Sequence, residues 1–162
     1  MRKISVLVVL IPVITAAPLL ADSVCKPVNG HFEATVVPPG AGHCPSVPGT
    51  LCTAGRVWGG IQGNYQFVAT GFLPSATIGG VPSVFFFTGK STIFLKSDEE
   101  LLGTDTGSID LPDAGGLGGF ASLITFTGGT GSMSGATGQI RLRGELSAGT
   151  TSGDYLGTLC TP

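Results

Sequence analysis

Charged residues that alternate near the C-terminal end of the chain are the side chains best placed to do chemistry. Arg141, Arg143 and Glu145 occupy every second position, and a β-strand places such residues on one face. If that face points into a barrel, the three side chains line a lumen pocket, with Glu33 or Arg56 as their partners. If it points outward, they form an ordinary solvated surface. Alternation alone leaves both possibilities open, so all five residues are candidates for the lumen.

Other reactive residues occur without the spacing that a catalytic or metal site requires. His31 and His43 could contribute to a Ser-His-Asp triad, but the chain has no Gly-x-Ser-x-Gly motif. The acidic residues 98–100 are adjacent in a turn rather than paired across a cleft. The aspartates between residues 105 and 113 lack the spacing of an EF-hand calcium loop. The sequence therefore assigns no catalytic residue, no metal and no cofactor, and it leaves open whether the protein is an enzyme.

Four cysteines are present, and an even number in an exported chain is typical of disulfide bonds. Three connectivities are possible. We expect Cys44 to pair with Cys52, because a local bridge would close the short loop between them. We expect Cys25 to pair with Cys160, because a bridge there would join the first strand of a barrel to its last. A zinc site built from Cys44, Cys52 and the two histidines is a weaker alternative, since no Cys-x-x-Cys or His-x-x-x-His pair occurs.

The first residues have the pattern of a secretory signal peptide. Arg2 and Lys3 precede an apolar run over residues 4–14, and small residues follow up to Ala21. We expect cleavage after Ala21, which leaves a single secreted or periplasmic domain over residues 22–162. An uncleaved membrane anchor is the alternative, although the apolar run is shorter than the roughly 20 residues that span a bilayer.

Composition excludes some partners and favours a β-fold. Without the signal segment, six basic and ten acidic residues remain, a net charge of −4. Nucleic acid and anionic lipid both attract clustered Lys and Arg, so neither is an expected partner, and no membrane association is expected after cleavage. The chain contains 27 glycines, which with many Thr, Ser, Val and Phe favour short strands and turns over helices.

Runs of β-forming residues separated by turn signals predict about eight strands, which is typical of a sandwich or a closed barrel. A bend or bulge is expected at Gly89. The predicted strands cover residues 31–37, 53–61, 64–73, 84–96, 101–111, 120–127, 139–146 and 154–160.

The triplet Phe85-Phe86-Phe87 would place phenyl rings on both faces of its strand. One face would then pack in the lumen. The other would pack beneath a loop or against a second copy of the chain, so a homo-oligomer is one expectation.

The most specific string in the chain is Gly-Gly-Thr-Gly-Ser-Met-Ser-Gly-Ala-Thr-Gly-Gln-Ile-Arg-Leu, residues 128–142. A phosphate-binding loop would need Gly-Lys-Ser/Thr leading into a helix, whereas a strand follows here. The alternative is a tight connection between two strands, in which the glycines permit positive φ. Ser132 to Ala136 would make one helical turn across the end of the barrel.

This string resembles the corresponding strand connection of the allene oxide cyclase barrel family and, more loosely, of the dirigent proteins. A fainter likeness extends back to about Phe85 and forward to Cys160, and residues 51–55 resemble secreted bacterial members of this group. The resemblance implies an all-β fold with a closed, eight-stranded antiparallel barrel of the calycin or allene oxide cyclase type. It also implies an apolar lumen. The family's catalytic residues have no aligned motif here, although Glu33 lies where an early-strand glutamate would be.

Two functions are therefore expected. The first is a secreted barrel module that binds a small apolar molecule in its lumen. The second is a cofactor-independent cyclase or isomerase of the allene oxide cyclase or dirigent type. A buried polar cluster beside a cavity would favour the second function.

Overall fold

The computed structural model describes residues 23–75, 82–111, 116 and 118–162. The predicted signal peptide lies outside these residues. Eight β-strands and one short 3-10 helix make up the described chain. They are β1 (Val24–Val37), β2 (Cys52–Gly59), β3 (Gly63–Pro74), β4 (Val84–Leu95), β5 (Glu100–Asp110), β6 (Gly118–Gly129), η1 (Gly131–Met133), β7 (Thr137–Ser147) and β8 (Thr150–Thr161).

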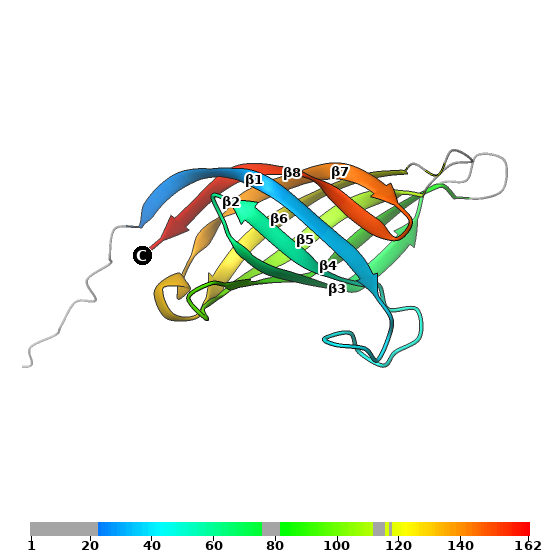
Figure 1. Cartoon of the computed structure of the whole chain (residues 1–162), viewed down its shortest axis with the longest axis horizontal. Coiled ribbons are helices and arrows are strands. Elements are labelled where there is room, and N and C mark those ends of the chain that lie inside the picture. The colour runs from blue at the N-terminus through cyan, green and yellow to red at the C-terminus, as the bar shows by residue number, and fades with distance from the viewer. Residues whose placement is uncertain (1–22, 76–81, 112–115, 117) are drawn as a thin grey trace, which may run out of the picture.

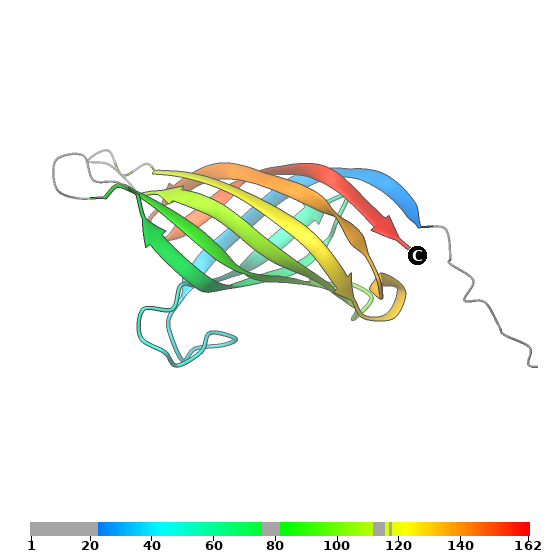
Figure 2. The same cartoon turned by 180° about the vertical axis from the view of Figure 1, so that it is seen from behind.

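The strands form a closed antiparallel barrel in which each strand pairs with its neighbours in sequence. Closure comes from β1 and β8, which pair from Val24 opposite Thr161 to Thr35 opposite Thr150. The strands are inclined to the long axis of the barrel, and β1 begins beside the end of β8 (Figures 1 and 2). We call the end of the barrel where β1 begins and β8 ends the terminus end. The β2–β3, β4–β5 and β6–β7 connections also lie there. The other end of the barrel is called the opposite end. The expected all-β, eight-stranded barrel is confirmed.

All eight predicted strands are present, and β1 differs most from its prediction. It begins at Val24 rather than residue 31, because residues 24–29 pair with β8 alone, beyond the end of β2. Pro27 lies in this segment. A proline removes a ladder hydrogen-bond donor and is tolerated in a strand that has a partner on one side only.

The bulge expected at Gly89 lies on the neighbouring strand instead. The register between β3 and β4 shifts between Ala69 and Gly71, so Thr70 is the extra residue, next to Gly89 in the ladder. Gly89 has a different role: a Cβ there would collide with the ring of Phe67. The glycine makes room for an aromatic side chain in the lumen rather than for a kink.

Side chains that point inward fill most of the barrel. The phenylalanine triplet follows this alternation: Phe87 is buried, Phe86 is 53% exposed, and Phe85 stacks on Phe72 with ring centroids 4.9 Å apart. The expected self-association through this segment stays a prediction. The buried cluster consists of Val28, Phe32, Ala34, Val57, Ile61, Tyr65, Phe67, Phe87, Ile93, Leu101, Ile124, Phe126, Ala136, Ile140, Leu142 and Tyr155.

Both expected disulfide pairs are present. Cys25 of β1 and Cys160 of β8 are direct partners across the closing strand pair, with an S–S distance of 2.03 Å. Cys44 and Cys52 are bonded at 2.08 Å and are buried where the loop after β1 returns to the barrel. His43 in this loop lies 3.1 Å from the carbonyl oxygen of Phe67, so the loop is held against β3.

The glycine-rich connection joins β6 to β7 as predicted, although its helical turn, η1, covers Gly131–Met133 rather than the expected Ser132 to Ala136. Glu99 in the β4–β5 turn holds it: its Oε1 accepts the backbone N–H of Ser132 at 2.6 Å, and its Oε2 accepts the Ser132 hydroxyl at 2.9 Å. These hydrogen bonds lower the pKa of Glu99 below its usual range. Gly131 and Gly138 both have positive φ, at 56° and 114°. The connection is thus built into the terminus end of the barrel.

We predict that Gly138→Ala destabilises the protein far more than Gly149→Ala. Both glycines have positive φ, so both substitutions carry a strain of about 1–3 kcal/mol. A Cβ at Gly138 would also collide with the backbone carbonyl of Thr158, whereas a Cβ at Gly149 meets open space. Urea unfolding of the two variants measures the difference. Equal losses would mean that the close approach of β7 to β8 at Gly138 is absent.

Candidate functional site

The five charged residues proposed for the lumen lie on the outside of the barrel. Glu33, Arg56, Arg141, Arg143 and Glu145 are all exposed, and Glu33 is the cross-strand partner of Arg56. The residues next to them in each strand have the side chains that point into the barrel. The solvated surface, left open by the sequence, is therefore the correct interpretation of this charged face, and the lumen interpretation is corrected.

Both histidines also lie outside the lumen. His31 is exposed, and its Nδ1 lies 2.6 Å from Oδ1 of Asp154. Its ring tilts over Trp58 with centroids 5.9 Å apart. Cys44 and Cys52 are bonded to each other, which removes two thiolates from the alternative zinc site. Within the described ranges, no group of three His, Cys, Asp or Glu side chains is placed to hold a metal ion.

A buried carboxylate occupies the middle of the lumen instead. Asp105 on β5 is 1% exposed. Its Oδ1 accepts the hydroxyl of Ser122 at 2.5 Å, and its Oδ2 accepts the hydroxyls of Ser91 at 2.9 Å and Tyr65 at 3.2 Å. Tyr65 and Ser91 are also within hydrogen-bond distance of each other, at 3.1 Å. Four consecutive strands, β3 to β6, each contribute one member of this cluster.

Among the described residues, no buried cation accompanies this cluster. The buried polar or charged residues of the described chain are Ser91, Asp105, Ser122 and Thr151, and none of them is a cation. Burial raises the pKa of Asp105, and the hydrogen bonds from Ser122, Ser91 and Tyr65 oppose that rise only in part. Burial also raises the pKa of Tyr65, with the nearby Asp105 adding to the effect. Both groups therefore keep their protons to a higher pH than they would in water.

A small cavity lies against this cluster, towards the opposite end of the barrel. Its volume is about 30 Å³, which is the room that one water-sized group needs. Aromatic rings form much of its wall: Phe67 meets Phe87 edge-on at 5.3 Å, and Phe87 stacks with Phe120 at 6.0 Å. The lining residues are Phe32, Leu51, Thr53, Tyr65, Phe67, Phe87, Asp105, Ile109, Phe120, Leu142 and Thr151.

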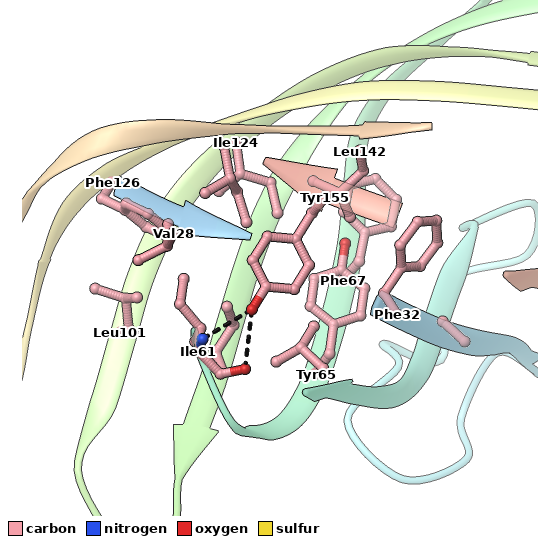
Figure 3. Packing of buried hydrophobic residues seen from close by; sticks show 14 of the residues in the cluster. Val28, Phe32, Ile61, Tyr65, Phe67, Leu101, Ile124, Phe126, Leu142 and Tyr155 are labelled. Atoms are coloured by element: carbon pink, nitrogen blue, oxygen red, sulfur yellow. Dashed lines mark hydrogen bonds between the residues drawn. The ribbon is translucent and has the colours of Figure 1, made fainter. Parts of the chain in front are cut away.

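The terminus end of the lumen is closed by a second tyrosine. The hydroxyl of Tyr155 accepts the backbone N–H of Ile61 at 2.7 Å and donates to the carbonyl oxygen of Ile61 at 3.1 Å (Figure 3). Ile61 lies in the β2–β3 turn, so this pair of bonds draws the turn over the barrel. Gly30 makes room for the tyrosine, because a Cβ there would lie within 2.8 Å of its ring. The buried Tyr155–Ile61 contact therefore occupies the terminus end of the lumen.

The sequence contained a signal for Asp105 that the charged residues obscured. Leu101, Gly103, Asp105, Gly107 and Ile109 share one face of β5, and a face with Leu and Ile at its ends is an inward face. The hydroxyl partners come from other strands, and the separation between Tyr65 and Asp105 is 40 residues. Their meeting depends on strand register, which no local pattern encodes.

Comparison of the chain with protein-family models, with curated proteins and with solved structures found no match. The residues described contain no helix of the length and apolarity needed to cross a membrane. The candidate site thus rests on its geometry alone.

We predict that Asp105→Ala destabilises the protein, whereas Asp105→Asn does not. The alanine removes the shared acceptor of three buried hydroxyls, and each buried polar group left unpaired costs about 1–3 kcal/mol. The asparagine keeps an acceptor oxygen and removes the buried charge. Denaturant unfolding compares them, with Asp110→Asn on the exposed end of β5 as the control. Equal stabilities of the alanine and asparagine variants would contradict the network.

We further predict that the wild type loses stability relative to Asp105→Asn as the pH rises. The pKa of Asp105 is raised above its usual value of 3.8 in the folded protein, so the folded state holds the proton after the unfolded state has released it. Stability then falls between the unfolded and the folded pKa. Unfolding free energies of the two proteins from pH 3 upward, roughly in steps of half a unit, give the difference. A difference that stays constant would show that Asp105 has an ordinary pKa.

Proposed function

We propose that this protein is an exported β-barrel module that binds a small, largely apolar molecule in the opposite end of its lumen. The observation that carries the proposal is the cavity beside Asp105, which phenyl rings line within the buried cluster of the barrel. Concave, mostly apolar sites with a few convergent polar groups are where proteins bind small molecules.

Export is supported by two features. The N-terminal segment has the pattern of a signal peptide, and the described domain contains two disulfide bonds. Disulfides of this kind persist in oxidising compartments and are rare in reducing ones. The resemblance of residues 128–142 to the allene oxide cyclase barrel family points in the same direction as the cavity, since that family has an apolar lumen.

The volume of the cavity limits the ligand. About 30 Å³ holds one water-sized group, so a larger molecule has to displace side chains at the mouth. Phe120 and Ile109 line the cavity and are half-buried, so we expect the rotation of these two side chains to make room for a larger molecule. We infer that the ligand is slender, with a narrow head that reaches Asp105 and an apolar body that replaces ring contacts.

A cofactor-independent cyclase or isomerase is the second candidate function, and the acids at the cavity favour it. Asp105 and Tyr65 lie in its wall, and burial raises the pKa of each. A carboxyl group that stays protonated in an apolar site can act as a general acid. In this case Asp105→Asn would abolish turnover of a bound substrate and leave its binding intact, whereas a binding module would show no turnover at all.

The binding proposal predicts that a slender apolar probe such as 1-hexanol stabilises the protein. Expected results are a higher melting temperature and NMR shift changes at Phe87 and Phe120, which line the cavity. Ile109→Trp should abolish both effects by filling the mouth, whereas Phe86→Leu, on the exposed side of β4, should leave them unchanged. Absence of stabilisation in the wild type by both 1-hexanol and its charged analogue n-hexylammonium, at any soluble concentration, would contradict a lumen binding site.

A further inference from the structure

The carboxyl group of Asp105 restricts the chemical class of the ligand more than the shape of the cavity does. We infer that the molecule bound in the lumen is a primary ammonium compound, whose positive head pairs with Asp105 and whose apolar tail lies between the phenyl rings. This inference rests on the proposed lumen-binding function and specifies its ligand class.

The first support is a buried carboxylate without a counter-ion. Its hydrogen-bond partners are all neutral, namely the hydroxyls of Ser91, Ser122 and Tyr65 and the backbone N–H of Thr106. The buried polar residues of the described chain include no Lys, Arg or His. Burying an ionised carboxylate without an opposite charge is costly. A cationic ligand would remove that cost, whereas an anionic ligand would add a second negative charge beside the first.

The second support is the direction of the hydrogen bonds. The hydroxyls of Ser91, Ser122 and Tyr65 each donate to Asp105, so these donors are already used. A ligand carbonyl would find no free donor among them. A ligand N–H finds an acceptor: the bond from Tyr65 to Oδ2 is the longest of the three, at 3.2 Å, and Tyr65 keeps Ser91 as an alternative partner at 3.1 Å. An ammonium group can therefore replace Tyr65 at Oδ2.

The third support is the aromatic wall. Phe32, Tyr65, Phe67, Phe87 and Phe120 all line the cavity that Asp105 borders. The face of an aromatic ring attracts cations, and the attraction is strongest where water is excluded. Rings and carboxylate thus favour the same charge on the ligand.

Size selects among cations. A cavity of about 30 Å³ has room for one water-sized group, so a primary ammonium head needs less displacement of side chains than a trimethylammonium head does. The raised pKa of Asp105 adds a consequence: pairing with a cation favours the ionised carboxyl, so binding should tighten as the pH rises through that pKa. Tyr65 is the other titratable group that faces Asp105, and its own pKa is raised out of this range.

The test compares two probes of equal length, n-hexylammonium and 1-hexanol, by calorimetric titration at neutral pH. Wild-type protein should bind hexylammonium at least about tenfold more tightly than hexanol. Asp105→Asn should remove this preference by weakening hexylammonium about tenfold or more, and should change hexanol binding less than about twofold. Asp110→Asn, which removes an exposed carboxylate from the same strand, should behave as the wild type. Melting curves confirm that both variants are folded.

Any other outcome distinguishes failure of the ammonium inference from failure of the proposed binding function. Equal affinities of the two probes for the wild type would overturn the ammonium inference and leave the binding function standing. A preference for hexylammonium that survives in Asp105→Asn, or disappears in Asp110→Asn, would place the cation on the outer surface and overturn the inference as well. If neither probe binds the wild type, the proposed binding function itself is wrong.

Discussion

The width of a closed eight-stranded barrel is the constraint on which the rest of this structure depends. Such a barrel has an interior just wide enough for side chains to fill, so a large inward side chain needs a small one beside it. Glycines supply this space. A Cβ at Gly89 would collide with the ring of Phe67, one at Gly107 with the ring of Phe87, and one at Gly30 with Tyr155. Closure of β1 on β8, fastened by a disulfide, holds the lumen at that width.

The position of Asp105 follows from this packing. Gly103 and Gly107 flank it on the inward face of β5, and each leaves room for a side chain from a neighbouring strand. The carboxylate between them is therefore surrounded by apolar groups, with hydroxyls from Ser91 and Ser122 on the adjacent strands as its partners. The hydroxyls provide hydrogen-bond donors for the carboxylate of Asp105, but they do not neutralise its charge. The lumen therefore holds a hydrogen-bonded carboxylate that lacks a counter-ion.

Local pattern in the sequence was sufficient for the number of strands and for the Cys44–Cys52 bridge. The Cys25–Cys160 bridge followed from the expected barrel, which joins its first strand to its last, whereas the early start of β1 at Val24 depends on pairing with β8. The candidate site was harder to predict from the sequence. Alternation placed Arg141 and Arg143 on one face without saying which face was inward, and the charges made that face look functional. Asp105 is one of three aspartates between residues 105 and 113, and its place on an inward face does not by itself distinguish it as a site residue. Its partners Tyr65 and Ser91 are brought to it by strand register over sequence separations of 40 and 14 residues.

The inferred ligand class depends most on a buried carboxyl without a counter-ion, and a carbon-13 NMR titration of the Asp105 side chain tests for it directly. The signal is assigned by comparison with Asp105→Asn. In the free protein, the carboxyl should titrate clearly above its usual value of 3.8, and saturating hexylammonium should move the midpoint downward. A midpoint at or below 3.8 in the free protein, unchanged by the cation, would contradict both the buried charge and the ligand class inferred from it.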